Sequence, residues 1–211
     1  MTEKKYIFVY GAGISGQGVA EVLAKRGKKV ILDNDEPREV DPKVTKILEK
    51  TGGAVIMKKE PTPYLKESLY MIISPGIPFT TATAQKAKGL GVEIIGEAEQ
   101  AGRLYKGKWV GVTGTNGKTT TTTLLGEMLA TLPVKTAVGG NIGFALSKET
   151  ENLDANSYIA AELSSFQLEG TTSLRINIAL ILNITPDHIE RHGNMENYIA
   201  AKAKIFAYQT K

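Results

Sequence analysis

The sequence predicts an α/β protein in which a Rossmann-like parallel-sheet domain at residues 1–96 precedes a P-loop α/β central domain at residues 97–211. Three observations support this prediction. Short apolar runs alternate with helical stretches, a glycine-rich turn joins a strand to a helix once in each half, and only about three strand candidates follow residue 107. Such alternation is typical of a parallel sheet covered by helices on both faces. Three strands make a small sheet, so we expect the second domain to be truncated.

The first domain is expected to contain five strands and three helices. The strands are predicted at Tyr6–Tyr10, Lys29–Asp33, Ala54–Met57, Leu69–Ser74 and Val92–Ile95. The helices are predicted at Ser15–Arg26, Pro42–Thr51 and Thr81–Lys88. These runs are apolar and rich in β-branched residues where strands are predicted, and they show helical spacing where helices are predicted.

The second domain begins with a helix and continues with the same alternation. Its helices are predicted at Glu97–Tyr105, Thr119–Ala130 and Met195–Tyr208. Its strands are predicted at Lys108–Val112, Tyr158–Glu162 and Ile176–Asn183.

Composition restricts the class of protein. Apolar residues make up 42% and charged residues 23% of the 211 residues, as in a globular protein with a sizeable core. The chain has no cysteine, which excludes disulfides, thiolate nucleophiles and zinc–sulfur sites. No apolar run is long enough to cross a bilayer, and no signal-peptide pattern precedes the first strand. We therefore expect a cytoplasmic protein without a membrane partner.

The net charge of +4 is mildly basic, and the lysines are scattered along the chain. A nucleic-acid-binding protein usually concentrates its basic residues in a patch or stripe. A small anionic ligand such as a nucleotide fits this distribution at least as well. We expect no nucleic-acid partner.

The first glycine-rich turn, GAGISG at Gly11–Gly16, has the spacing of a dinucleotide-binding fingerprint. Glycines allow a tight turn in which backbone N–H groups and a helix N-terminus approach a pyrophosphate. Asp33 ends the second predicted strand, where the fingerprint places an acid for a ribose hydroxyl. The turn indicates a diphosphate, which a UDP-sugar provides as well as NAD does. The structural alternative is a turn that only lets the helix and sheet pack.

The second glycine-rich turn, GVTGTNGKT at Gly111–Thr119, also lies between a strand and a helix. Backbone N–H groups in such a loop cradle phosphates, Lys118 can reach the β and γ oxygens, and the Thr119 hydroxyl can bind Mg²⁺. Val112 occupies the place of the first Walker glycine, which is a departure from the strict pattern. A protein with both turns is expected to bind two phosphorylated ligands.

Three residues after the phosphate loop are candidates for metal binding. Glu162 ends a predicted strand, where ligands of open α/β sheets gather, and could hold Mg²⁺. The two histidines, His188 and His192, are four residues apart, so a helix would place both on one face. Gly193 follows His192 directly, which is typical of a residue that ends and caps an element, so His188, nearer the carboxyl end of the strand, is the better candidate. A surface glutamate and isolated histidines are the structural alternatives.

Lys202 lies in the last predicted helix between Tyr198 and Phe206, in an apolar stripe that also contains Ile199 and Ile205. A lysine on a buried face either extends its ammonium group to solvent or loses its charge through desolvation. A neutral amine can react with CO₂ to form a carbamate, which is a metal-binding carboxylate. Spacing alone favours the first alternative, in which the ammonium group extends to solvent.

Several longer motifs accompany these residues. They are GVTGTNGKTT at Gly111–Thr120, GNIG at Gly140–Gly143, ELSSFQLE at Glu162–Glu169, NITPDHIERHG at Asn183–Gly193 and YIAAK at Tyr198–Lys202. With SPGI at Ser74–Ile77 and the first glycine turn, they make the chain similar to the Mur ligases of peptidoglycan synthesis along its entire length. ELSSFQL together with GNIG resembles the glutamate-adding member of the family.

The resemblance implies a role for each candidate residue. It implies that the UDP-sugar contacts Gly13, Ile14, Ser15, Gly16, Asp33, Asn34, Ser74 and Asn141. It implies that ATP is bound by Gly114, Thr115, Asn116, Gly117, Lys118, Thr119 and Thr120. Thr119 and Glu162 would hold a first Mg²⁺, and His188 and a carbamylated Lys202 a second. The implied catalytic residues are Lys118, Glu162, His188 and Lys202. His192 is not carried over as a ligand.

By the same resemblance, the whole enzyme is an ATP-dependent ligase that adds D-glutamate to UDP-N-acetylmuramoyl-L-alanine through an acyl phosphate. It would act as a monomer in peptidoglycan synthesis, and so in cell wall biogenesis, cell shape and cell division. Family members are much longer than this chain and have a C-terminal domain that is absent here. We therefore expect this fragment to be inactive by itself.

Two other hypotheses remain from the residues alone. An NAD-dependent oxidoreductase would explain the first glycine turn and Asp33, but it leaves the second turn, Glu162 and His188 without a role. A nucleotide-sugar-binding fragment without chemistry is also compatible with a truncated second domain.

Overall fold

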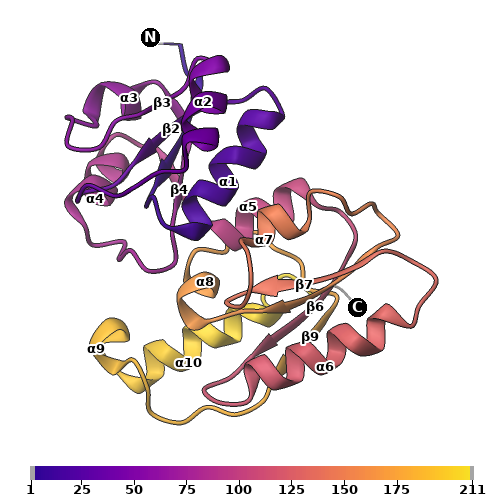
Figure 1. The fold of residues 1–211 in the computed structure, drawn as a ribbon. Coiled ribbons are helices and arrows are strands. Elements are labelled where there is room, and N and C mark those ends of the chain that lie inside the picture. Colours follow the sequence, from indigo (N-terminus) through magenta and orange to yellow (C-terminus); the bar gives the residue numbers. More distant parts are fainter. Residues whose placement is uncertain (1–2, 210–211) are drawn as a thin grey trace. The chain divides into compact units, whose positions relative to one another are not determined.

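A computed structural model describes residues 3–209, and the chain divides into two compact units, Met1–Glu97 and Ala98–Lys211 (Figure 1). The predicted domains end at residues 96 and 211, and residues 1–2 and 210–211 of those ranges lie outside the described part. Each unit contains one parallel sheet, so the predicted α/β fold is confirmed. Across residues 3–209, no helix is long and apolar enough to cross a membrane.

The first unit has a five-stranded parallel sheet in the order β3-β2-β1-β4-β5. Its strands are β1 (Tyr6–Tyr10), β2 (Lys29–Asp33), β3 (Ala54–Val55), β4 (Ser68–Ile73) and β5 (Glu93–Gly96). The chain leaves β1 toward β2 on one side, and β4 lies on the other side of β1. The strand order therefore reverses beside the carboxyl end of β1, which is where ligands of open α/β sheets bind.

Helices cover both faces of this sheet (Figure 1). They are α1 (Ile14–Lys25), α2 (Pro42–Lys50), α3 (Thr62–Lys66) and α4 (Ala82–Gly89). Phe8 and Tyr10 of β1 pack with Leu65 of α3 and Ala84 of α4 in one buried cluster. Helices α1 and α2 pack against each other and against β2. Because β1 is buried on both faces, it is apolar along its length rather than alternating.

The second unit has a four-stranded parallel sheet in the order β7-β8-β6-β9. Its strands are β6 (Lys108–Thr113), β7 (Thr136–Gly140), β8 (Tyr158–Glu162) and β9 (Ile178–Ile181). The expectation of three strands is wrong, because β7 was not predicted. Its sequence, TAVGG, contains one strongly apolar residue and ends in two glycines, which weakens the strand pattern.

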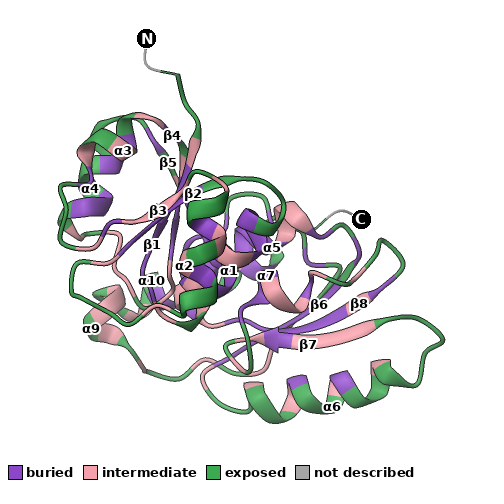
Figure 2. Cartoon of the chain, turned by 45° about the horizontal axis from the view of Figure 1, so that its top comes forward, coloured by how far each residue is buried: buried purple, intermediate pink, exposed green. Residues whose placement is uncertain are grey.

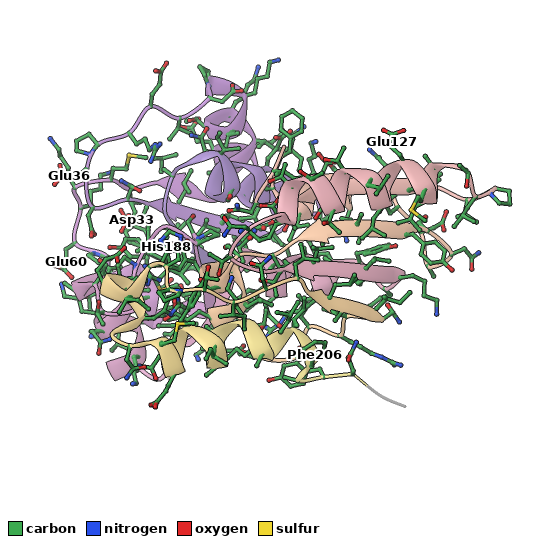
Figure 3. The ribbon with its side chains drawn as sticks, turned by 90° about the horizontal axis from the view of Figure 1, so that it is seen from below. Asp33, Glu36, Glu60, Glu127, His188 and Phe206 are labelled. Atoms are coloured by element: carbon green, nitrogen blue, oxygen red, sulfur yellow. The ribbon has the colours of Figure 1, made fainter. Side chains whose placement is uncertain are left out.

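Helix α6 (Lys118–Ala130) packs on β8 and β7, on one face of this sheet. Its outer surface is mostly exposed, and Glu127 points away from the sheet (Figures 2 and 3). The buried cluster on the other face includes residues from α5 (Glu97–Leu104), α7 (Leu146–Glu149) and α8 (Ser165–Glu169). Two more helices follow, α9 (Ile189–His192) and α10 (Met195–Ala203), and α10 continues into a short 3-10 helix at Lys204–Phe206.

The main differences from the predicted elements have simple causes. Strands β3 and β9 are shorter than predicted because both are edge strands, which pair with a neighbour on one side only. The last predicted helix ends early, at Ala203, where the chain tightens into the 3-10 helix. Helices α3, α7, α8 and α9 were not predicted, and each has only four or five residues, too few to show helical periodicity.

Candidate functional site

The first glycine turn joins β1 to α1 in the first unit. Gly13 is the N-cap of α1 and provides no side-chain cap, so N–H groups of the first helical turn remain available to a ligand. A Cβ atom at Gly16 would collide with the Gly11 carbonyl oxygen, so this position requires glycine. The turn can therefore accept an anion at the positive end of α1.

Three predicted substrate residues hold this turn in place. The Gly11 N–H donates to the Asp33 carbonyl oxygen at 2.8 Å, and the Ser74 hydroxyl donates to the Gly11 carbonyl oxygen at 3.1 Å. The Ala12 N–H donates to Asn34 Oδ1 at 3.0 Å. The structure thus brings Asp33, Asn34 and Ser74 to the carboxyl ends of β2 and β4, next to the turn.

A cavity of about 210 Å³ lies beside the turn and is lined in part by Asp33, Asn34, Lys58 and Thr83. The Asp33 side chain is buried, and burial raises the pKa of its carboxyl group. Its Oδ1 atom accepts from the Asn34 N–H at 2.8 Å. Asp33, Asn34 and Asp35 offer acceptors to this cavity, and Lys58 and Lys59 offer donors.

Two further residues of the first unit present side chains at the turn. Ile14 is 73% exposed, although it is the first residue of a helix that packs on the sheet. A Cβ atom at Gly13 would lie 3.7 Å from Arg38 Nη1, so the guanidinium group lies over the turn. Sequence analysis selected Ile14 but missed Arg38, because an arginine in an irregular loop forms no recognisable pattern.

The phosphate loop connects β6 to α6 in the second unit. Gly117 has a φ of 82° and is the N-cap of α6, without a side-chain cap. The loop is held from the other side by Asn183, whose carbonyl oxygen accepts from the Thr115 N–H at 3.1 Å. The Asn183 side chain accepts from the Asn116 N–H at 2.9 Å and donates to the Asn116 carbonyl oxygen at 3.0 Å. The loop is therefore shaped before any phosphate binds.

Thr115 adds a second set of loop contacts. Its hydroxyl donates to the Thr185 carbonyl oxygen at 3.1 Å, accepts from the Thr185 N–H at 3.0 Å and lies 3.1 Å from the Tyr198 hydroxyl. Lys118 Nζ donates to the carbonyl oxygens of Gly114 and Thr115, at 3.0 and 2.8 Å. Its ammonium group thus folds over the loop, at the position where a phosphate would bind. Thr120 is exposed in the first turn of α6.

Glu162 brings two other predicted residues together. Its Oε2 accepts from the Thr119 hydroxyl at 2.8 Å, and its Oε1 accepts from Asn141 Nδ2 at 2.9 Å. The Glu162 residue is 1% exposed at the carboxyl end of β8, whereas Thr119 and Asn141 are exposed. A buried carboxylate linked to the phosphate-loop threonine is the arrangement that a Mg²⁺–nucleotide site requires.

Lys202 lies within the second unit, not at its surface, and is only 2% exposed. Its Nζ donates to the Gly114 carbonyl oxygen at 2.8 Å and lies 4.6 Å from the centre of the Tyr198 ring. Burial lowers its pKa to about 8, with a further lowering from the Lys118 charge, against an opposite effect of Asp187. The alternative in which the ammonium group reaches solvent is therefore wrong.

The predicted apolar stripe around Lys202 is only partly correct. Tyr198 and Ile205 are buried, but Ile199 and Phe206 are exposed, and Phe206 is visible on the outer side of the helix end in Figure 3. Phe206 lies beyond the end of α10 at Ala203, and Ile199 lies within α10 but outside its buried face, which is formed by Tyr198, Ala201 and Lys202. Lys202 is on that buried face.

Both histidines contact the same aromatic ring. Phe166 lies between them, with ring-centre distances of 4.9 Å to His188 and 5.5 Å to His192. His188 is the N-cap of α9, with a φ of 51°, and its Nε2 lies 3.4 Å from Asp187 Oδ2. His192 is the last residue of α9, and its Nε2 lies 3.0 Å from Ser165 Oγ. Burial lowers the pKa of His192.

No hydrogen bond or ion pair joins His188 to Lys202 within residues 3–209. They are connected through rings, because His192 contacts Phe166 on one side and Tyr198 on the other, at 5.3 Å between ring centres. In the described part of the chain, no group of three His, Asp or Glu side chains is arranged to hold a metal ion. A nucleotide-bound Mg²⁺ takes most of its ligands from phosphate and water, so Thr119 and Glu162 fit one without such a group.

Four residues that shape the site were not predicted: Arg38, Ser165, Asn183 and Tyr198. The last three lie within motifs that carried the resemblance, so their positions were noted without a role. Their functions depend on contacts between segments distant in sequence, such as that from Asn183 to Asn116. No spacing rule could have indicated those contacts.

Two family profiles match the chain. The profile of the Mur ligase MurD-like N-terminal domain matches residues 5–96, and that of the Mur ligase middle domain matches residues 112–211. A UDP-N-acetylmuramoylalanine–D-glutamate ligase from Desulfitobacterium hafniense is 44% identical over 210 residues, which cover 98% of this chain and 45% of that protein. A ligase of the same name from Pelotomaculum thermopropionicum is 42% identical over 209 residues, with the same coverage. The chain thus spans less than half the length of these relatives.

Solved structures share the fold at lower identity. The UDP-N-acetylmuramate:L-alanyl-γ-D-glutamyl-meso-diaminopimelate ligase from Neisseria meningitides gives a TM-score of 0.61 at 18% identity, over 98% of this chain and 69% of that one. The UDP-N-acetylmuramate–alanine ligase from Thermotoga maritima gives 0.58 at 24% identity, over 97% and 47%. Both matches run through the two units, as the two profiles do. The chain therefore belongs to the Mur ligase family and consists of its N-terminal domain and sequence from its middle domain.

Proposed function

We propose that this chain is the substrate-binding and ATP-binding part of a ligase that adds D-glutamate to UDP-N-acetylmuramoyl-L-alanine. Residues 1–96 would bind the UDP-substrate and residues 97–211 would bind ATP. Relatives that carry this ligase name are 38–44% identical over nearly the whole chain, which supports the assignment. The enzyme would be a cytoplasmic monomer in peptidoglycan precursor synthesis, without nucleic-acid or membrane partners.

The observation that carries the proposal is the position of Glu162 between Thr119 and Asn141. Thr119 belongs to the nucleotide loop, and Asn141 belongs to the GNIG segment that the resemblance assigns to the substrate. One buried carboxylate therefore links the two ligand sites. This link is expected where a phosphoryl group passes from ATP to a substrate carboxylate.

The reaction would take place in two steps. The substrate carboxylate attacks the γ-phosphorus of ATP and ADP leaves, and the amine of D-glutamate then displaces phosphate from the acyl phosphate. Phosphoryl transfer depends mainly on positioning and charge stabilisation. Lys118 would leave the Gly114 and Thr115 carbonyl oxygens and bind the β and γ oxygens. Asn141 would orient the substrate carboxylate, while N–H groups of α6 hold the phosphates.

Mg²⁺ would neutralise phosphate charge during the transfer. Thr119 and Glu162 would hold a first ion, since both present oxygen atoms beside the loop. A second ion would use His188 and a carbamate on Lys202. The buried amine of Lys202 has a lowered pKa, which favours reaction with CO₂. A carbamate would also replace the repulsion between Lys202 and Lys118 by attraction.

Calorimetric titration of the 211-residue chain with UDP-N-acetylmuramoyl-L-alanine, MgATP and NAD tests the proposal. We expect the first two ligands to bind, one each, and NAD to bind more weakly than the UDP-substrate. Asn34→Ala should weaken the UDP-substrate alone, and Lys118→Ala should weaken ATP alone. Micromolar NAD binding without detectable UDP-substrate binding would favour the oxidoreductase hypothesis and overturn this one.

A further inference from the structure

A second cavity of about 370 Å³ lies in the second unit, at the opposite end of β6 from the phosphate loop. It is enclosed by the end of α5, residues 105–107, the first residues of β6 and residues 173–177 before β9. Strand β6 rises about 3.3 Å per residue from Lys108 to Thr113, so the two sites are separated by about 16 Å. The cavity is therefore distinct from the nucleotide and substrate sites proposed above.

The lining of this cavity is strongly basic. It includes the side chains of Arg103, Lys106, Lys108 and Arg175, and among residues 3–209 no carboxylate lines it. Glu99 contacts Arg103 from outside the lining, with 3.3 Å between Oε1 and Nε. Glu99 offsets the charge of Arg103, so the excess positive charge comes from Lys106, Lys108 and Arg175, and an anion bound there would relieve their mutual repulsion.

Two of these cations are available to a ligand. Lys108 and Arg175 are exposed, and within the described residues neither side chain makes a hydrogen bond or an ion pair. Lys106 Nζ donates to the Gly102 carbonyl oxygen at 3.1 Å, which leaves two of its protons for another acceptor. The guanidinium of Arg175 can bind two oxygens of a phosphate at once.

The walls of the cavity are rigid. Tyr105 and Trp109 form its buried aromatic floor, with 5.7 Å between ring centres, and the Tyr105 hydroxyl donates to the Ser157 carbonyl oxygen at 2.5 Å. Asn177 Oδ1 accepts from the Trp109 N–H at 2.8 Å and fixes one side of the opening. With the floor held in this way, the conformational entropy lost on binding comes mainly from ordering the exposed lysine and arginine side chains.

We propose that this cavity binds a small phosphorylated molecule with at least two negative charges. The volume is at the lower end of the range for small-molecule sites, which suits a compact ligand such as a sugar phosphate or a nucleoside monophosphate.

The test uses the 211-residue chain with Lys118→Ala, which disables the phosphate loop, and sodium pyrophosphate as the probe. Amide chemical shifts are followed by ¹⁵N NMR during the titration. We expect saturable shifts at residues 102–109 and 173–177, with a dissociation constant at least tenfold higher after Lys108→Ala/Arg175→Ala. The matched control Arg26→Ala/Lys28→Ala removes the same charge from exposed residues of the first unit and should leave the constant unchanged.

Each possible result of this titration leads to a different conclusion about the site. Shifts confined to the phosphate loop, or equal weakening in both double variants, would overturn the site. Citrate is titrated in parallel, and equal or tighter binding of citrate at the same residues would overturn the phosphate assignment. Because Lys108 and Arg175 are exposed, their double variant should keep the melting temperature of the parent chain. None of these results depends on ligase activity, so the proposed function and this site can fail independently.

Discussion

Lys118 and Lys202 donate hydrogen bonds to the same acceptor, the carbonyl oxygen of Gly114, at 3.0 and 2.8 Å. The two lysines come from the start of α6 and from α10, and Lys202 is buried. Two ammonium groups that share one acceptor repel each other, and this repulsion adds to burial in lowering the pKa of Lys202. The loop thus holds two cations at the point where ATP phosphates would bind.

Lys118→Ala should weaken MgATP binding to this chain by a factor of about 10² or more, because a charge-stabilising contact to phosphate is typically worth several kcal/mol. Binding of UDP-N-acetylmuramoyl-L-alanine should be unchanged, since Lys118 is not among the residues at the first glycine turn. Isothermal titration calorimetry measures both constants. Lys46→Ala, an exposed lysine of α2, is the control for loss of one charge. ATP binding within twofold of the parent chain would remove Lys118 from the nucleotide site.

Asn183→Ala should loosen the phosphate loop, because it removes the two side-chain hydrogen bonds to Asn116. Each such bond contributes about 1 kcal/mol net, so we expect ATP affinity to fall by up to roughly 30-fold. Hydrogen exchange at residues 114–117 should become faster, while exchange in the core strand β8 stays the same. Asn177→Ala, in the same unit but at the far end of β6, is the matched control. Unchanged exchange in the loop would show that Asn183 does not shape it.

The elements that sequence predicted well are those whose evidence is local. The glycine turn before α1 and the phosphate loop before α6 are each encoded in fewer than ten consecutive residues. Strand β7 was missed because its strand character comes from pairing with β8 along Thr136–Gly140, not from its own composition. The stripe around Lys202 was drawn too wide because periodicity cannot show that α10 ends at Ala203.

In the candidate site, too, the identities of the residues could be predicted, but the contacts between distant segments could not. The resemblance indicated Thr119, Glu162 and Asn141, and the structure places them in hydrogen-bond contact. Their contact required the pairing of β6 with β8 and of β7 with β8, which no single-sequence pattern specifies. The spacing of His188 and His192 suggested a shared helix face. The structure instead has Phe166 between the two rings, because His188 lies before the helix that contains His192.

Glu99 should make the stability of the second unit depend on pH. Its carboxylate is fully buried and accepts hydrogen bonds from the N–H groups of Thr172, Ser173 and Leu174, at 3.0, 3.0 and 2.8 Å. Burial alone would raise its pKa, but bonds from Ser173, Thr172 and Arg103 prevail and lower it to about 2 from 4.5. The stabilisation is therefore present above pH 4.5 and is lost as pH falls toward 2.

Glu99→Gln tests this dependence. At pH 7 it should reduce the free energy of unfolding by an amount on the order of 3 kcal/mol, and the difference should shrink as pH falls below 4.5. Urea denaturation between pH 7 and pH 3 measures it. Glu60→Gln is the control, because the pKa of Glu60 is also lowered to about 2, mainly by hydrogen bonds from Thr62 and Lys86, but its side chain is exposed. Equal losses in both variants would contradict a special role for the buried carboxylate.

We expect ligase turnover to require Lys202, and we expect that another positively charged side chain cannot replace it. In a protein that combines this chain with the remaining length of its relatives, Lys202→Ala should lower kcat by at least about 10², as loss of a charge-stabilising group does. Lys202→Arg should fail as well, because a guanidinium stays protonated and cannot form a carbamate. Lys204→Ala is the matched control. Lys204 directly follows the same helix, and its Nζ donates to the Glu169 carbonyl oxygen at 2.7 Å.

Rescue experiments separate a carbamate from a packing role. If Lys202 supplies a carboxylate near Mg²⁺, acetate at high concentration should restore part of the kcat of Lys202→Ala by filling the vacated volume, and it should leave Lys204→Ala unchanged. Removal of dissolved CO₂ should lower the parent kcat reversibly, because about one tenth of an amine with a pKa near 8 is neutral at pH 7 and can exchange with CO₂. Steady-state measurement of kcat with added acetate, and with dissolved CO₂ removed, tests both expectations. Wild-type turnover in Lys202→Arg would show that the buried lysine acts only as a cation bound to Gly114.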